Sequence, residues 1–131
     1  MRLNVYQKEW IDRLKSGKSH KKERQLFGSR TNSNCCLGVA AMVCHDKGLC
    51  EINRSCVPTD LSEVAPVVVE KLKITFGGEI DTTKVKKKWV EYFDKKGYDY
   101  NSLISLNDET HMSHREIGNF INENRSAVFS V

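Results

Sequence analysis

The sequence predicts a mainly α protein, a single compact domain of four or five helices arranged around one buried central helix. Three observations lead to this prediction: several stretches repeat their apolar residues with the period of an amphipathic helix, one stretch is apolar on nearly every face, and only 2 of 131 residues are proline. A chain of this length suffices for one domain with its own core. The alternative is an α+β fold with a small β-hairpin built from residues 25–33 and the C-terminal tail.

The central helix is predicted at residues 35–47. This segment has two candidate stripes, and because both are apolar almost no face remains for water. Ser33 or Asn34 is the expected N-cap, and Gly48 is the expected terminator. Such a helix has to lie inside the protein with the others packed around it.

The same periodicity predicts four further helices. They span residues 4–16, 66–73, 83–96 and 114–124. In the second of these, a proline suits the first helical position, although the three valines at 67–69 leave a strand as an alternative. The last helix has the most complete start signal, a capping box between Ser113 and Glu116. We expect residues 98–106 to be an extended connector and residues 125–131 to be a short strand or irregular.

The composition is that of an ordinary globular domain, with 39% apolar and 29% charged residues, but the charge is unevenly distributed. Residues 1–30 hold nine Lys or Arg and three acids, a net charge of +6, whereas residues 31–131 have a net charge of −2. Such an excess indicates a surface for phosphate groups or for an acidic protein, with a merely solvated face as the alternative.

The cysteine count and the first residues bear on the compartment. Five cysteines is an odd number, and the chain starts without the apolar stretch that a signal peptide needs. We therefore expect a reducing, cytoplasmic environment. No run approaches the roughly 18 apolar residues of a membrane span, so we expect no membrane partner.

A cysteine nucleophile is the first candidate for chemistry. Cys35 stands at the predicted N-terminus of the central helix, where the positive end of the helix dipole lowers a thiol pKa and favours the thiolate. His111 or His114 would be the base, and Asn107 or Asp108 would orient it. The alternative is that Cys35 packs in the core, since free cysteine is among the most buried residue types.

A structural zinc ion is the second candidate. Cys44, His45, Cys50 and Cys56 offer the ligand types that zinc prefers. Their spacing is not that of two repeated cysteine pairs, and adjacent residues of a helix point about 100° apart. We therefore expect no cofactor, with zinc as the alternative.

The basic N-terminal quarter is the third candidate, as a surface for phosphate groups. The expected binding residues are Lys18, Lys21, Lys22, Arg24 and Arg30, joined by lysines at positions 84 and 86–88. The sequence contains no pattern of a known nucleic-acid-binding module, so the expectation depends on charge alone.

Several short elements follow one another in a characteristic order. They are Trp10 and Leu14 before Ser16 and Gly17, the block Cys35-Cys36-Leu37-Gly38-Val39, Pro66, and Leu106-Asn107-Asp108 before Ser113, Glu116 and Ile117. This order resembles a group of small uncharacterised proteins encoded by tailed bacteriophages, and it spans most of the chain. Here Ala40 and Ala41 replace the Leu-Cys continuation usual after the cysteine block. The resemblance implies a viral protein acting in the host cytoplasm and implies no particular activity.

We therefore expect a small phage accessory protein that binds a host or viral macromolecule, either a protein or a nucleic acid, through its basic N-terminal surface. The alternative from another functional class is a cysteine-dependent hydrolase that uses Cys35. The two hypotheses make opposite predictions, because Cys35→Ser would abolish only hydrolysis and charge reversal in the basic quarter would abolish only binding.

Overall fold

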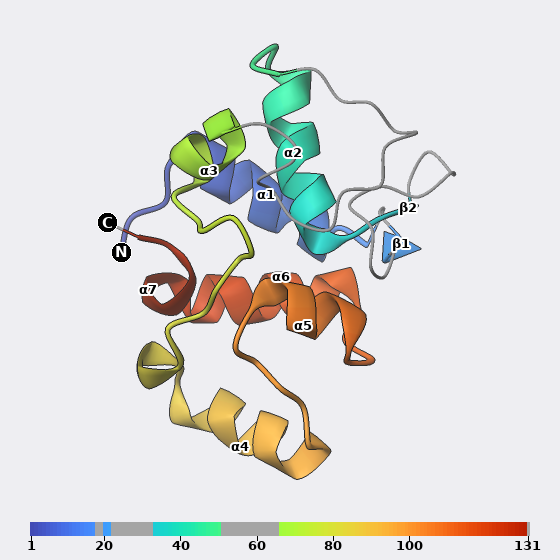
Figure 1. Ribbon diagram of the computed structural model, residues 1–131, viewed down its shortest axis with the longest axis vertical. Helices are drawn as coiled ribbons and strands as arrows, with labels where there is room; N and C mark the ends of the chain where they lie inside the picture. Colours follow the sequence, from blue (N-terminus) through green and yellow to red (C-terminus); the bar gives the residue numbers. More distant parts are fainter. Residues whose placement is uncertain (18–19, 22–32, 51–65, 131) are drawn as a thin grey trace.

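The computed structural model describes residues 1–17, 20–21, 33–50 and 66–130, which form a mainly helical fold (Figure 1). In chain order its elements are α1 (Val5–Lys15), β1 (His20–Lys21), β2 (Ser33–Asn34), α2 (Cys36–Asp46), α3 (Pro66–Leu72), the 3₁₀ helix η2 (Thr82–Lys84), α4 (Lys87–Lys96), α5 (Leu103–Asp108), α6 (His114–Glu123) and α7 (Arg125–Val128). The mainly α class is confirmed, and the buried apolar side chains form one core cluster.

Helix α2 is the central helix, as predicted. Eight of its eleven residues are buried, and α1, α3 and α5 all pack against it. Its N-cap is Cys35, whose Sγ accepts a hydrogen bond from the Gly38 N–H at 3.3 Å. The prediction of Ser33 or Asn34 as the cap is therefore wrong. Gly48 follows the helix with φ +74°, the left-handed conformation expected of a terminator.

Tertiary contacts explain where α2 begins. The Cys36 N–H donates to Asn107 Oδ1 in α5 at 3.0 Å, and the Trp10 Nε1–H in α1 donates to the Cys36 carbonyl at 2.9 Å. Both backbone polar groups of Cys36 are thus bonded to distant segments, and its N–H is satisfied without Ser33 or Asn34 as the cap.

Helix α1 begins with a capping box and crosses α6 at close range. Asn4 Oδ1 accepts from the Gln7 N–H, and Gln7 Oε1 accepts from the Asn4 N–H, both at 2.8 Å. At Gly118 in α6, an added Cβ would lie 3.0 Å from Leu14 Cβ and 3.2 Å from Lys15 N. The glycine therefore lets the two helices approach more closely than a residue with a side chain would permit.

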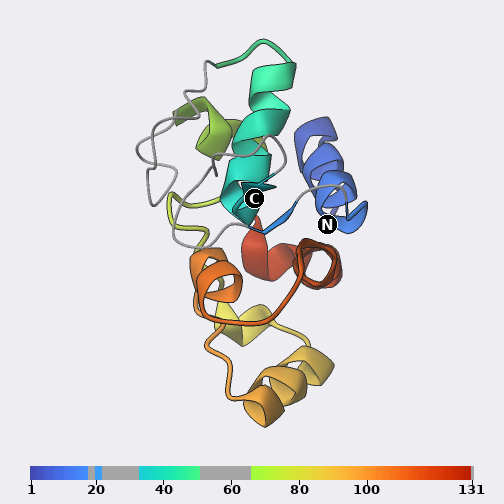
Figure 2. The ribbon, with the colours of Figure 1, turned by 90° about the vertical axis from the view of Figure 1, so that its right-hand side faces the viewer.

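One excursion of the chain, containing η2 and α4, leaves the main body and returns to it. An antiparallel bridge between Glu79 and Ser102 closes the excursion. Figures 1 and 2 both show α4 as the outermost helix at one end of the molecule. The ring centroids of Trp89 and Phe93 each lie 5.4 Å from that of Phe120 in α6. Aromatic packing therefore attaches the excursion to the core.

The predicted helices at 4–16, 66–73 and 114–124 are confirmed, and α6 starts with the predicted capping box. The valines at 67–69 lie in α3, so the strand alternative is wrong. The helix predicted at 83–96 is instead η2 followed by α4, because Val85 and Lys86 are extended, with ψ 134° and 144°.

Two stretches predicted to be non-helical are helices. Residues 103–108 form α5, where Ser102 Oγ accepts from the Ser105 N–H, so the extended connector ends earlier than predicted. The tail forms α7 rather than a strand. The described strands β1 and β2 pair in parallel and therefore do not form a hairpin. The remainder of the 25–33 region lies outside the described residues.

Candidate functional site

Cys35, the predicted nucleophile, lies at the N-terminus of α2 but is buried. Its side chain is only 7% exposed, and its Sγ accepts the hydrogen bond from Gly38 described above. Burial raises the pKa of the Cys35 thiol to about 12, and this outweighs the lowering effect of the backbone N–H groups of Gly38 and Leu37. At neutral pH the thiol is therefore protonated, which is the less reactive form.

The predicted orienting residues do reach this region. Asn107 Oδ1 binds the backbone N–H of Cys36, and the negative charge of Asp108 contributes to the raised pKa of Cys35. Of the two predicted bases, His111 is exposed, whereas His114 is buried as the first residue of α6. The fold thus brings the side chain of Asn107 to the start of α2, as the hydrolase hypothesis requires. Its amide oxygen, however, binds the backbone N–H of Cys36 rather than a histidine.

Three of the four predicted zinc ligands, Cys44, His45 and Cys50, lie in or just after the C-terminal half of α2. Cys44 is fully buried, and burial raises its pKa to about 11. Cys50 is half-buried, with its Sγ 4.0 Å from the Ala41 carbonyl, and Cys56 lies outside the described residues. Within residues 1–17, 20–21, 33–50 and 66–130, no three His, Cys, Asp or Glu side chains gather as a metal site would require.

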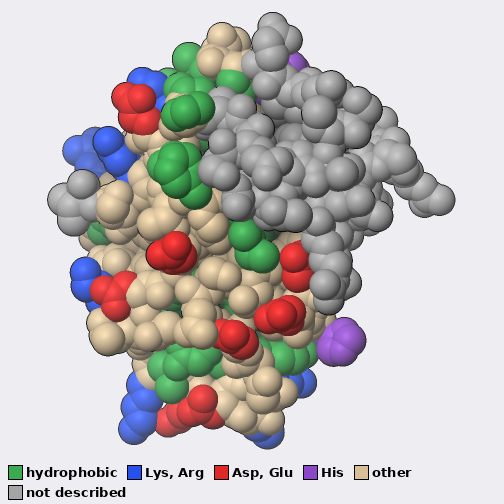
Figure 3. Space-filling view, in the orientation of Figure 1, with side chains coloured by type: hydrophobic (Ala, Val, Ile, Leu, Met, Phe, Trp, Pro, Cys, Tyr) green, Lys and Arg blue, Asp and Glu red, His purple; other side chains and the backbone are tan. Residues whose placement is uncertain are grey.

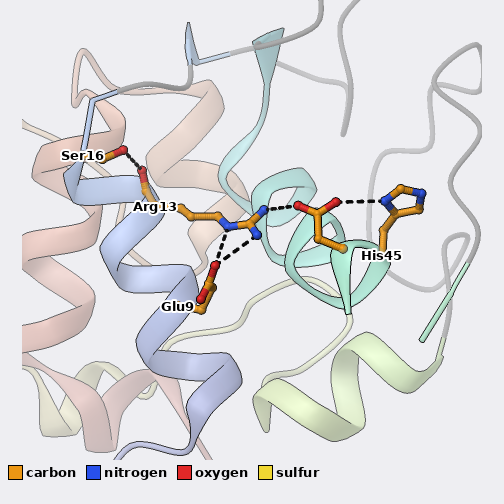
Figure 4. A network of polar contacts seen from close by, with 5 residues as sticks. Glu9, Arg13, Ser16 and His45 are labelled. Carbon is orange, nitrogen blue, oxygen red and sulfur yellow. Dashed lines mark hydrogen bonds and ion pairs between the residues drawn. The ribbon is translucent and has the colours of Figure 1, made fainter. Parts of the chain in front are cut away.

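His45 belongs to a surface network instead (Figure 4). Its Nδ1 lies 3.1 Å from Asp46, Asp46 binds Arg13 at 2.8 Å, and the Arg13 guanidinium also binds Glu9 at 3.1 Å. Partial burial opposes ionisation of Asp46, but hydrogen bonds from His45 and Arg13 outweigh it and lower its pKa. The network links α1 to the end of α2, and its exposed ion pairs stabilise the fold by about 0–1 kcal/mol each.

The predicted basic residues lie largely beyond the described part of the chain. Lys18, Lys22, Arg24 and Arg30 are not described, and Lys21 is described only as backbone in β1. The described residues nevertheless contain a second group of cations, which we call the basic face. Its members are Arg2, Lys73, Lys84, Lys86 and Arg125.

The basic face surrounds two adjoining hollows where the two chain ends lie close together (Figure 1). The larger hollow, the terminal cleft, has a volume of about 870 Å³. Its lining consists of Met1, Arg2, Asn4, Gln7, Lys73, Lys84, Ser126, Phe129 and Ser130. The smaller hollow, of about 280 Å³, shares Met1, Lys84 and Ser126 with it and adds Lys86, Asn122, Glu123, Asn124 and Arg125, so it contains one acidic side chain. In Figure 3, Lys and Arg side chains, with a few acidic ones, lie along this edge of the molecule.

Several charges of the basic face lack an acidic partner. Within the described part of the chain, Arg125 is held by neutral acceptors, including Asn122 Oδ1 at 2.7 Å and the Met1 carbonyl at 3.1 Å. Among the residues whose side chains are described, no acid lies in ion-pair range of Arg2 or Lys73. Lys84 lies 3.7 Å from Asp81, with both side chains well exposed, so this pair neutralises it weakly. The basic face therefore has positive charge available to a ligand.

Sequence reasoning found this face only in part. The sequence groups the lysines at 84 and 86 with the basic quarter, whereas Lys73 has only Lys71 beside it and Arg125 has no neighbouring cation, so the sequence singles out neither. Their proximity depends on how α3, α7 and the N-terminal segment meet, which no local pattern encodes.

Comparisons with protein-family models, curated proteins and solved structures find no match to this chain. None of the described helices combines the length and apolar character needed to cross a membrane.

Proposed function

We propose that this protein acts by binding a macromolecule and that its partner is a nucleic-acid backbone held by Lys and Arg side chains. One observation carries the proposal: the basic face brings together cations from separate segments, and among the described residues the partners that fix Arg125 there are neutral acceptors. With the phage resemblance of the sequence, we propose a viral accessory protein that works in the host cytoplasm.

The lining of the hollows favours phosphate groups over an acidic protein surface. Phosphate oxygens are bound in proteins by Lys and Arg together with Ser, Asn and Gln side chains, and these residue types line both hollows. Protein interfaces depend instead on aromatic and apolar anchors, whereas the one aromatic side chain here, Phe129, is only 3% exposed and the exposed apolar side chain is the single Met1. The predicted basic quarter is a separate candidate surface, because β1, which contains Lys21, lies on the side of the molecule opposite the two chain ends (Figure 1).

The alternative of a cysteine-dependent hydrolase is less favoured, because burial raises the pKa of Cys35 to about 12. The binding hypothesis predicts that Cys35→Ser leaves nucleic-acid affinity unchanged.

The proposal can be tested by fluorescence anisotropy with a labelled single-stranded oligonucleotide at several salt concentrations. We expect the double variant Lys84→Glu/Lys86→Glu to bind more weakly and, through the loss of two phosphate contacts, to lower the slope of log K against log salt by about 1.4. The matched control is Lys95→Glu/Lys96→Glu, which changes the charge equally at exposed positions outside both hollows.

Equal losses in the two double variants would show a general charge effect and contradict the proposal. Polyglutamate of equal charge serves as a second probe. If it binds as tightly as the oligonucleotide, the partner is an acidic protein and the nucleic-acid proposal is wrong.

A further inference from the structure

Lys73 occupies a backbone position at which glycine is the usual residue. Helix α3 ends at Leu72, and the Ile74 N–H returns to the Val69 carbonyl at 3.3 Å, which is the pattern of a Schellman motif. In this motif the residue between Leu72 and Ile74 has to adopt the left-handed backbone conformation. Lys73 does so with φ +57°, the only positive φ of a described residue other than glycine. A lysine here is strained, because its Cβ crowds the backbone.

The C-terminal segment holds this conformation in place. The Lys73 carbonyl accepts hydrogen bonds from the Ser130 N–H at 2.8 Å and from Ser130 Oγ at 3.2 Å. Lys73 itself lines the terminal cleft and is exposed. The strained turn thus places an ammonium group at the cleft where a glycine would place none.

The part of the cleft lining that comes from α1 is held in place, because its amide groups are bonded within the protein. Asn4 Nδ2 donates to the Lys71 carbonyl at 2.8 Å, and Gln7 Nε2 donates to the Leu72 carbonyl at 3.0 Å. The two amides of the α1 capping box therefore fasten the start of α1 to the end of α3. The cleft is preformed, so little conformational entropy is lost when a ligand enters.

We propose that the terminal cleft binds a phosphomonoester, with Arg2, Lys73 and Lys84 as the cationic ligands and the exposed Ser126 as a hydroxyl donor. A volume of about 870 Å³ lies within the range of small-molecule sites and accommodates a mononucleotide. Three cations from separate segments suit a dianion better than a phosphodiester, which has a single charge. The inference rests on the proposed function for its choice of phosphate over carboxylate.

A phosphomonoester group occurs both in a free nucleotide and as the terminal phosphate of a nucleic-acid strand, so the test has two arms. The first arm of the test titrates the full chain with inorganic phosphate, AMP and adenosine, while NMR follows the amide signals of Lys73, Ser126 and Ser130. We expect phosphate and AMP to shift these signals and adenosine to leave them unchanged at equal ionic strength. The second arm compares oligonucleotides of one sequence with a 5′-phosphate and with a 5′-hydroxyl.

The decisive variant is Lys73→Asn, because asparagine tolerates the left-handed conformation and the fold should be kept. Losing one charge-assisted contact should weaken AMP binding at least about tenfold. The control Lys96→Asn removes one exposed lysine at the far end of α4 and should bind AMP normally.

A preference for the 5′-phosphorylated strand assigns the ligand to a strand end, and AMP binding without that preference assigns it to a free nucleotide.

Two results would overturn the inference. Either phosphate and AMP cause no shift at the cleft, or Lys73→Asn and Lys96→Asn bind AMP equally well. If strands still bind with the expected salt dependence, the phosphomonoester site alone is refuted. If AMP binds and no strand does, the nucleic-acid proposal is refuted and the site stands.

Discussion

The reactivity of Cys35 is the property that best separates a binding protein from a cysteine hydrolase. Burial raises the pKa of this thiol from 9.0 to about 12. At pH 8 an ordinary thiol with a pKa of 9.0 is roughly one-tenth thiolate, whereas Cys35 is thiolate in about one molecule in 10⁴. Because the thiolate is the nucleophile, native Cys35 should react about 1000-fold more slowly than the same residue in the unfolded chain.

This rate can be measured by alkylation with iodoacetamide at pH 8, followed by mass spectrometry of the Cys35 peptide. The unfolded chain in urea supplies the reference rate, and the half-buried Cys50 supplies an internal comparison in the native protein. We expect alkylation of native Cys35 to be slow and to rise about tenfold for each pH unit up to about pH 11.

The reasoning fails if native Cys35 reacts within about tenfold of the unfolded chain at pH 8. Such a result would mean an accessible, ionised thiol at the N-terminus of α2, which is the arrangement that nucleophilic catalysis needs. The hydrolase hypothesis would then replace the binding hypothesis as the better account of this end of the helix.

Two further predictions concern stability. Because the pKa values of Cys35 and Cys44 are raised by folding, the unfolded chain loses these protons first, so stability is intact below about pH 9 and falls as the pH rises toward 11 and 12. Urea unfolding at pH 8 and pH 10.5 should show a lower free energy of unfolding at the higher pH. In Cys44→Ala this difference between the two pH values should be smaller by up to about 2 kcal/mol. Gly118→Ala should destabilise the protein by about 1–2 kcal/mol through overpacking against α1, although alanine normally favours a helix. At Gly77 an added Cβ would lie 3.9 Å from Ile104 Cδ1, an ordinary contact distance, so Gly77→Ala should show no such clash. A stabilised Gly118→Ala variant would contradict the close crossing.

The elements that could be predicted from the sequence are those whose determinants are local. Helix α6 begins where the Ser113–Glu116 capping box placed it, because both partners of the box lie within one turn. The burial of α2 was equally predictable, since a helix that is apolar on nearly every face has no stable place at the surface.

The predictions that were wrong concern elements whose position depends on tertiary contacts. The cap of α2 shifted to Cys35 because Asn107, 71 residues from Cys36, supplies an acceptor for the helix N-terminus. Helices α5 and α7 have six and four residues, too few for a period to be recognised, and they form because their apolar residues are buried in the core. A prediction from one sequence has no access to either cause.

The candidate sites divide in the same way. Cys35 was found because a thiol at a predicted helix start is a local pattern, and the structure then showed that burial raises its pKa. The basic face was predicted only in part, because Arg2, Lys73 and Arg125 are far apart in the chain. They meet only because Ser130 binds the Lys73 carbonyl and Arg125 binds the Met1 carbonyl.

The start of α2 and the terminal cleft also differ in how many of their polar groups are available to bind a ligand. At the start of α2 the Cys36 N–H, the Cys36 carbonyl and the Cys35 sulfur are already engaged by Asn107, Trp10 and Gly38. A ligand there would have to displace contacts that hold the central helix. At the terminal cleft the wall amides are likewise bonded, but several cations have no acidic neighbour among the described side chains. An anion could pair with these cations without breaking a contact of the fold, so the cleft is the better place for a ligand.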